Sequence, residues 1–295
     1  MITMSRMPAV ILAVLLAACQ PLLNTLTPTG GYGIAGDVTY DAKSRLGLDV
    51  YKPSDARGAP VVVFFYGGRW SRGSKSEYRY VGEALASEGF VAVIPDTRHY
   101  PEARFNGFMQ DAANAVVWAE KRVAGYGGDP SRIFVMGHSS GAQLAAMLAL
   151  NPEYLKAAGG DRARLRGMIG LAGPYDFLPL LAPDLRDMFG PPEQFELSQP
   201  ISFIDGENPP LLLLHGEDDD TVPVSNTVSL AARVAHRGGS VEKVLYPKMG
   251  HAWMIASLSS TLRGRTDVLA QVADFISRKA REPLRPTAVE TQPRR

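Results

Sequence analysis

Cysteine is nearly absent from this chain, which has one in 295 residues, at Cys19. A single cysteine cannot form a disulfide within the chain, so a disulfide-stapled fold is excluded. A structural zinc site built from several thiolates is excluded for the same reason. The same count argues against a cysteine nucleophile, so any nucleophilic chemistry has to come from another residue type.

A surplus of charge of either sign is also missing. The chain has 31 lysines and arginines against 30 aspartates and glutamates, a formal net charge of +1. Without a basic field, no nucleic-acid partner is indicated. Glu217 to Asp220 are four acids in a row, but they lack the alternating aspartates and the glycine of a calcium loop. We therefore expect no bound metal.

The apolar run near the N-terminus is too short to span a bilayer as a helix. It covers Val10 to Leu16 and follows a positive charge at Arg6, a pattern typical of a secretory signal. The run ends in Leu16-Ala17-Ala18-Cys19, which resembles a bacterial lipobox. The alternative interpretation is a buried apolar helix.

The lipobox resemblance implies cleavage before Cys19, which then carries lipid on its sulfur and amine. We accordingly expect a signal peptide over residues 1–18 and a membrane anchor at Cys19, since several acyl chains hold a protein on a bilayer almost irreversibly. The next residue is Gln20 and not aspartate. By the usual sorting rule of Gram-negative lipoproteins, this implies the outer membrane.

Apolar runs of β type alternate with segments of helical spacing along the body of the chain. Most of the runs are continuous, as in strands that are buried on both faces of a parallel sheet. This alternation predicts an α/β fold, with a mostly parallel sheet and helices on both faces. The expected strands cover residues 37–40, 46–51, 60–65, 90–94, 133–136, 168–171, 211–214 and 241–246. The expected helices cover residues 78–88, 108–123, 142–148, 228–235 and 268–276.

One doubly wound domain is expected over residues 37–281. Before it, residues 19–36 include many Thr, Gly and Pro and are predicted to be a tether. After it, residues 282–295 hold three prolines and no apolar period, which predicts a disordered tail. Residues 174–205 interrupt the alternation after the sixth strand with prolines and large apolar side chains. We interpret them as a small cap over the carboxyl edge of the sheet, because long loops in compact domains are often functional.

The pentapeptide Gly137-His138-Ser139-Ser140-Gly141 carries the clearest chemical signal. A β-type run precedes it and a helical run follows. Strand, G-x-S-x-G and helix are the context of a nucleophile elbow, which presents a serine at the start of a helix. There the N–H groups and the helix dipole favour developing negative charge. Ser139 is therefore the candidate nucleophile, and the alternative is a Gly-Ser turn without chemistry.

A serine hydroxyl needs a base, and the base needs a group that orients it. Of the five histidines, His251 lies just past the last expected strand, in a glycine-containing loop. His138 lies inside the elbow and cannot readily turn back onto Ser139. The acid is expected at the carboxyl end of another strand, where residues 217–220 supply four candidates. The chain order Ser, Asp, His is the order of α/β-hydrolases.

Four motifs resemble those of α/β-hydrolase esterases, of the carboxylesterase, hormone-sensitive-lipase-like and kynurenine-formamidase-like branches, over about residues 40–280. They are the elbow, the acid motif His215-Gly216-x-x-Asp219-x-x-Val222-Pro223 with the base motif Gly250-His251, the oxyanion loop Tyr66-Gly67-Gly68-Arg69-Trp70, and Asp96-Thr97-Arg98 with Pro101-Glu102. The resemblance implies an α/β-hydrolase fold and a triad of Ser139, Asp219 and His251.

The resemblance also implies an oxyanion hole made of backbone N–H groups, from Gly68, Arg69 and Ser140. The loop departs from the family pattern at two positions, with Tyr66 in place of histidine and Arg69 in place of a third glycine. Because the donors are backbone groups, these side-chain changes need not abolish the hole. Three side chains are candidates for contact with substrate: Tyr66, Trp70 and His138.

These assignments predict a serine hydrolase that cleaves small-molecule esters of short- to medium-chain carboxylic acids through an acyl-enzyme intermediate, without a cofactor. Hydrolysis of aryl formamides or peptides is an alternative, and so is acyl transfer to an alcohol. An alternative of a different class is a non-catalytic, surface-anchored binding protein on a hydrolase fold. The intact triad pattern argues against this alternative, because a site that no longer catalyses usually lacks one of the catalytic residues.

Overall fold

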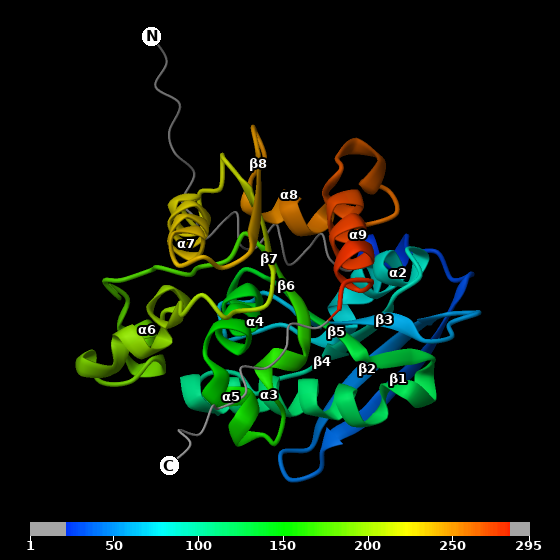
Figure 1. Cartoon of the computed structure of the whole chain (residues 1–295), viewed down its shortest axis with the longest axis horizontal. Coiled ribbons are helices and arrows are strands. Elements are labelled where there is room, and N and C mark those ends of the chain that lie inside the picture. The colour runs from blue at the N-terminus through cyan, green and yellow to red at the C-terminus, as the bar shows by residue number, and fades with distance from the viewer. Residues whose placement is uncertain (1–21, 284–295) are drawn as a thin grey trace, which may run out of the picture.

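The computed structural model describes residues 22–283, which form one eight-stranded sheet with helices on both faces (Figure 1). The sheet order is β1-β2-β4-β3-β5-β6-β7-β8. β1 and β2 pair antiparallel with each other, and β2 pairs antiparallel with β4. All other pairs are parallel. The predicted mostly parallel α/β sheet is therefore confirmed. The expected signal peptide over residues 1–18 and Cys19 lie outside the described residues.

The strands lie close to the predicted runs, and the longer helices do too. The strands are β1 (Tyr32–Asp41), β2 (Leu46–Pro53), β3 (Ala59–Phe65), β4 (Val91–Pro95), β5 (Gly128–His138), β6 (Leu165–Leu171), β7 (Leu211–Gly216) and β8 (Val241–Tyr246). The longer helices are α2 (Arg79–Ser87), α3 (Phe105–Arg122), α4 (Ser140–Leu150), α7 (Ser225–His236) and α9 (Val268–Lys279). Three short helices were not predicted: α5 (Pro152–Ala157), α6 (Pro183–Met188) and α8 (His251–Ala256).

The continuous apolar runs reflect a sheet that is buried on both faces. In β3, Val61, Val63 and Phe65 pack in the layer that also contains α3, α4 and α7 residues. Val62 and Phe64, which point the other way, pack in the layer with α2, α8 and α9 residues. Successive side chains of a strand point to opposite faces, so a strand covered on both faces needs apolar residues at every position.

The prediction of a tether over residues 19–36 is wrong in its C-terminal part. β1 begins at Tyr32, which pairs with Pro53 of β2. Before the strand, Asn24 donates to the Ser76 carbonyl (2.7 Å) and accepts from the Tyr80 N–H (3.3 Å), so this segment packs on the domain. β1 is an edge strand whose residues are mostly half-buried or exposed. Such a strand needs few apolar residues, and its composition therefore resembles that of a linker.

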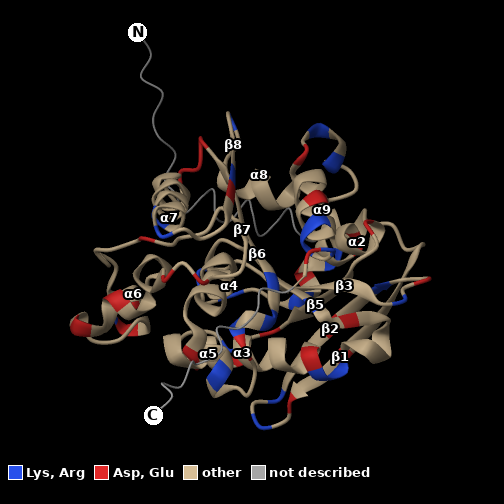
Figure 2. Cartoon of the chain, in the orientation of Figure 1, with Lys and Arg blue, Asp and Glu red and all other residues tan. Residues whose placement is uncertain are grey.

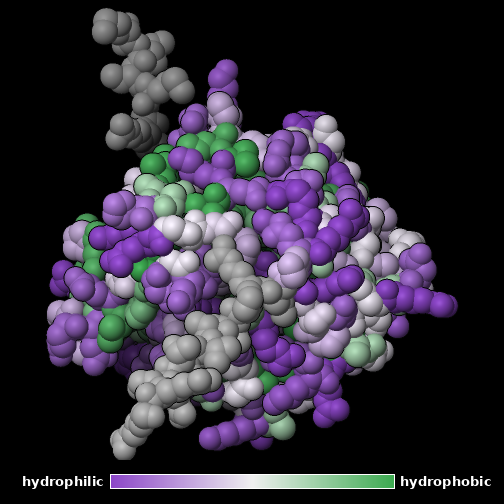
Figure 3. Space-filling model, in the orientation of Figure 1, coloured by the Kyte–Doolittle hydropathy of each residue, from purple (hydrophilic) through white to green (hydrophobic). Residues whose placement is uncertain are grey.

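The segment 174–205 lies between β6 and β7 and contains α6 with two 3-10 turns, η4 (Pro192–Ser198) and η5 (Pro200–Phe203). Leu178, Leu181 and Leu197 of this segment are exposed. Figure 3 shows hydrophobic colour on the side of the molecule that carries α6.

Within residues 22–283, no helix combines the length and the apolar character needed to cross a bilayer.

Candidate active site

Ser139 lies at a sharp turn between β5 and α4, with φ 54° and ψ −126°. This conformation is costly for a residue with a side chain and persists only where the surroundings hold it. Here the Ser139 N–H donates to the Leu171 carbonyl of β6 (2.9 Å). The flanking glycines allow the close approach: a β-carbon on Gly137 would lie 2.2 Å from the Gly141 carbonyl oxygen, and one on Gly141 would lie 2.1 Å from that of Phe65.

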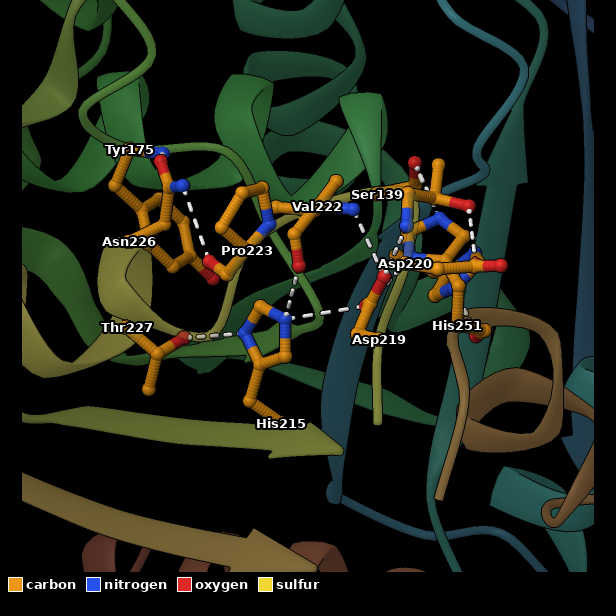
Figure 4. A network of polar contacts seen from close by, with 12 residues as sticks. Ser139, Tyr175, His215, Asp219, Asp220, Val222, Pro223, Asn226, Thr227 and His251 are labelled. Atoms are coloured by element: carbon orange, nitrogen blue, oxygen red, sulfur yellow. Dashed lines mark hydrogen bonds and ion pairs between the residues drawn. The ribbon is translucent and has the colours of Figure 1, made fainter. Parts of the chain in front are cut away.

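The structure brings Ser139, His251 and Asp219 together in one hydrogen-bonded row (Figure 4). His251 Nε2 lies 2.9 Å from Ser139 Oγ. His251 Nδ1 lies 2.7 Å from Asp219 Oδ2. The three residues follow β5, β8 and β7, whose carboxyl ends meet at one edge of the parallel sheet. The row has the geometry in which a histidine accepts a serine proton while a carboxylate holds its other nitrogen.

Asp219 is a buried carboxylate with its oxygens fully occupied by donors. Its side chain is 0% exposed. Oδ1 accepts from the N–H groups of Thr221 (2.9 Å) and Val222 (2.8 Å), and Oδ2 accepts from the His251 and His215 rings. Burial by itself raises the pKa of Asp219, but the hydrogen bonds from His215 and His251 outweigh it and hold the pKa well below its usual range. Asp219 is therefore ionised and can stabilise an imidazolium.

His251 is the first residue of α8 and not a loop residue as predicted. The short helix contains too few residues for a periodic pattern to be visible. His138, in the elbow, supports His251. The Nε2 of His138 donates to the His251 carbonyl (3.2 Å), and the centres of the two rings are 4.7 Å apart. Burial, followed by the neighbouring His251, lowers the pKa of His138 to about 3. His138 is therefore neutral and places no positive charge beside His251.

The predicted oxyanion loop lies against Ser139. A β-carbon on Gly67 would be 3.0 Å from Ser139 Cβ. Gly68, Arg69 and Trp70 follow with φ values of 148°, 55° and 57°. Glycine adopts a positive φ readily, but Arg69 and Trp70 are strained there and need outside support. Ser140 is the first residue of α4, where helical N–H groups have no partner within the helix. The oxyanion roles of Gly68, Arg69 and Ser140 stay predictions.

Tyr66, which replaces the family histidine, supports this loop from behind. Its hydroxyl donates to Asp96 Oδ1 (2.9 Å), and its ring stacks on Tyr78 at 5.3 Å. Tyr78 in turn donates to the Gly67 carbonyl (3.3 Å). Burial, followed by the Asp96 charge, raises the pKa of Tyr66 far above its usual value, so the hydroxyl stays a donor. These contacts hold the loop without the histidine.

Trp70 and Arg69 join the loop to the segment 174–205. The Trp70 ring packs against Phe177 and Phe189, at 5.8 and 4.9 Å between ring centres. Its Nε1 donates to Gln143 Oε1 (3.2 Å). Arg69 forms a bidentate ion pair with Asp184 of α6. Figure 2 shows acidic residues on this helix. Substrate contact by Tyr66, Trp70 and His138 stays a prediction.

Sequence reasoning gave no role to four residues that the structure adds to this site. His215 hydrogen-bonds Asp219, and Thr227 hydrogen-bonds His215. The other two are Gln143 and Asp184. His215 belongs to the acid motif, and its position four residues before Asp219 was the available signal. Gln143 and Asp184 are joined to the loop only by tertiary contacts. Across residues 22–283, no group of three or more His, Cys, Asp or Glu side chains is arranged to hold a metal ion.

The chain is similar in sequence to known esterases. The BD-FAE family profile matches residues 48–234. A probable isoprenylcysteine alpha-carbonyl methylesterase of Arabidopsis thaliana is 28% identical over 255 residues, which cover 78% of this chain and 53% of that protein. Esterase LipC of Mycobacterium tuberculosis is 31% identical over 229 residues, covering 70% of this chain and 56% of its own.

The solved structures show the shared fold. A truncated carbohydrate esterase from gut microbiota superposes with a TM-score of 0.75 at 22% identity, over 87% of this chain and 99% of that one. This likeness confirms the α/β-hydrolase fold. The chain spans only 53% to 62% of the length of the curated methylesterases it matches.

Proposed function

The chain belongs to the BD-FAE family, and from this membership we propose that it hydrolyses carboxylic esters through an acyl-enzyme on Ser139. The observation that carries the proposal is the unbroken row from Ser139 Oγ through His251 to the buried Asp219. A binding protein that had lost catalysis would have no use for the strained serine at the elbow. The esterase names of the relatives point the same way.

In the proposed mechanism, His251 Nε2 takes the proton of Ser139 Oγ as that oxygen attacks the ester carbonyl. Asp219 holds the proton on His251 Nδ1 and stabilises the imidazolium. The backbone N–H groups of Gly68, Arg69 and Ser140 bind the developing oxyanion, and loss of one such donor typically costs about 3–4 kcal/mol. His251 then returns the proton to the leaving alcohol. Water activated by the same histidine releases the acid, and no metal or organic cofactor takes part.

We propose short- to medium-chain acyl esters as the substrate class. The support is the apolar aromatic cluster of Trp70, Phe177 and Phe189 beside the oxyanion loop. Rings of this kind favour an apolar substrate group over a charged one. A series of p-nitrophenyl esters from acetate to decanoate, run beside N-formylkynurenine, tests this assignment. Faster turnover of the formamide would favour the alternative activity.

Replacement of Ser139 by Ala tests the activity itself. The variant is expected to lose turnover of p-nitrophenyl butyrate and labelling by a fluorophosphonate probe, since no other group replaces the hydroxyl. Ser260→Ala is the matched control, because within residues 22–283 the hydroxyl of this half-buried serine hydrogen-bonds only the Leu26 carbonyl (3.5 Å). Undiminished hydrolysis by the Ser139 variant would refute the mechanism. A folded wild-type protein without hydrolysis or labelling would favour the binding role.

We also propose that the mature chain is a lipoprotein of a Gram-negative outer membrane, anchored through Cys19. The support is the lipobox-like segment that ends at this sole cysteine, followed by Gln20. Cys19→Ser should remove incorporation of labelled palmitate and shift the protein from the detergent phase to the aqueous phase. An unlabelled wild-type chain would contradict the anchor and leave the catalytic proposal untouched.

A further inference from the structure

A second histidine contacts the triad carboxylate from the side opposite His251 (Figure 4). His215 lies near the end of β7, and its ring is 0% exposed. Its Nε2 lies 3.1 Å from Asp219 Oδ2, the same oxygen that His251 Nδ1 approaches at 2.7 Å. The hydrogen-bonded row of Ser139, His251 and Asp219 is complete without this residue. A second imidazole on the working oxygen of the acid therefore calls for a physical explanation.

The partners of His215 determine where its proton lies. Its Nε2 is also 3.0 Å from the Val222 carbonyl, and a carbonyl oxygen can only accept. Nε2 therefore carries hydrogen and donates to both Asp219 and Val222. At the other nitrogen, Thr227 Oγ1 lies 2.8 Å from Nδ1. In the neutral ring, the threonine hydroxyl donates to Nδ1, and every polar group of the pair has a partner.

A charged His215 would leave the threonine hydroxyl unsatisfied. Nδ1–H would then donate to Thr227, and the hydroxyl hydrogen would need another acceptor. Among residues 22–283, His215 is the only hydrogen-bond partner of Thr227 Oγ1, and Thr227 is fully buried. A buried donor without an acceptor is costly. The Thr227 hydroxyl thus favours the neutral His215 ring and anchors it at Nδ1, with Nε2–H directed at Asp219.

The position of Thr227 is itself fixed by the first turn of α7. The preceding residue, Asn226, is buried and accepts through Oδ1 from the N–H groups of Tyr175 and Asp176, both at 2.8 Å. Its amide nitrogen donates to the Pro223 carbonyl (3.1 Å). Hydrogen bonds therefore tie this turn to the loop that carries the acid and to the start of the segment 174–205.

We propose that His215 is a positioning residue for the triad, with Thr227 anchoring its neutral ring, and that His215 and Thr227 together set how strongly Asp219 binds His251. The inference rests on the proposed esterase function. Two N–H donors share one carboxylate oxygen, so each draws less on its negative charge. Without His215, the charge of Asp219 would act on His251 alone and hold a proton on that ring more tightly.

Few other charged groups face Asp219 and His251. From the elbow, the neutral His138 ring lies 4.7 Å from the His251 ring. Within the described residues, the ion pairs of Asp219 are with His215 and His251 alone. Asp218 and Asp220 flank the acid in sequence and are exposed. A change in the pH dependence of His251 after mutation at Thr227 would therefore report on His215 and Asp219.

Thr227→Val tests the inference, because it removes the hydroxyl and keeps the shape and the His215 ring. We expect kcat for p-nitrophenyl acetate to fall about 3- to 10-fold with KM unchanged. We also expect the acid limb of the kcat–pH profile to move to higher pH, by about half a unit. Thr227→Ser, which keeps the hydroxyl, should behave as wild type. Thermal unfolding of each variant separates these effects from loss of folded protein.

Substitutions at His215 provide a second, independent pair. His215→Gln can place an amide N–H near the position of Nε2, so it should retain most of the activity. His215→Leu has no donor there, so the acid limb of its kcat–pH profile should move to higher pH. An acid limb that stays in place in both Thr227→Val and His215→Leu would overturn the inference, because a merely structural role lowers activity without moving that pH. Thr227→Ser as impaired as Thr227→Val would overturn it as well.

An NMR titration of His251 separates this inference from the proposed function. The ring protons report its protonation in the intact protein whether or not an ester is hydrolysed. A raised pKa of His251 in Thr227→Val supports the inference even in a chain without turnover. An unchanged pKa in an active enzyme refutes the inference alone.

Discussion

Replacement of Asp219 by Asn should nearly abolish turnover while leaving the shape of the site unchanged. The structure determines how the new amide must lie. The N–H groups of Thr221 and Val222 both point at Oδ1, at 2.9 and 2.8 Å, so the amide oxygen must occupy that position. Turning the amide round would take this acceptor from both N–H groups, and for the buried Val222 N–H that loss costs about 1–3 kcal/mol. The NH2 group therefore lies where Oδ2 was.

That NH2 group faces His251 Nδ1, which is 2.7 Å from Oδ2 in the wild-type site. Two donors cannot share this contact, so His251 moves its proton to Nε2 and accepts at Nδ1. Nε2 then presents hydrogen to Ser139 Oγ and cannot take its proton. In a serine protease the corresponding change lowers kcat about 10⁴-fold, which is about 5 kcal/mol of transition-state stabilisation. We expect a loss of the same order here.

The assay is steady-state hydrolysis of p-nitrophenyl butyrate together with the rate of fluorophosphonate labelling. Both should fall, since both need the hydroxyl of Ser139 to be deprotonated by His251. Asp220→Asn is the matched control: the residue is exposed, and among the described residues its side chain accepts a hydrogen bond only from the Thr221 hydroxyl (3.3 Å). Activity of Asp219→Asn within tenfold of wild type would refute the reasoning. An equal loss in Asp220→Asn would do so too.

Two further predictions concern stability and the oxyanion loop. His138 has a folded pKa of about 3, below its unfolded value of about 6.5, so the unfolded chain binds more protons between these values. The free energy of unfolding should therefore fall as pH drops below about 6.5, and His138→Gln should remove up to roughly 5 kcal/mol of that loss. Parallel pH dependence of urea unfolding in both proteins would contradict this. Gly68→Ala places a β-carbon 1.9 Å from the Arg72 carbonyl oxygen at φ 148°, so kcat should fall at least about tenfold as the loop shifts. Gly89→Ala, at φ 87° with open space around it, controls for the backbone strain and should keep its activity.

The fold was predictable because it depends mainly on the pattern of apolar residues along the chain. A strand that is covered on both faces must be apolar at every position, so the inner strands appear as continuous runs between helical segments. Residues 32–36, the first half of β1, were not predicted as strand because an edge strand is half exposed and tolerates glycine. The short helices α5, α6 and α8 escaped it because six residues hold fewer than two turns of periodic pattern.

At the site, the sequence alone identified Ser139, because the elbow is a local structure that needs glycine on both sides of the serine. It also placed His251 after the last strand, and family resemblance selected Asp219 from four adjacent acids. Burial separates that acid physically from its neighbours. The Asp219 side chain is 0% exposed and accepts from four donors, whereas Asp218 and Asp220 are exposed.

The tertiary structure alone decided what holds these residues in place. His215 and Thr227 lie on β7 and α7, and their contact depends on how that helix packs on the sheet. Tyr66 can stand in place of the family histidine because Asp96, 30 residues away, accepts a hydrogen bond from its hydroxyl. Local patterns determined the strands, the elbow and the order of the candidate groups. Orientation, burial and protonation depend on partners distant in sequence, and only the folded chain brings those partners together.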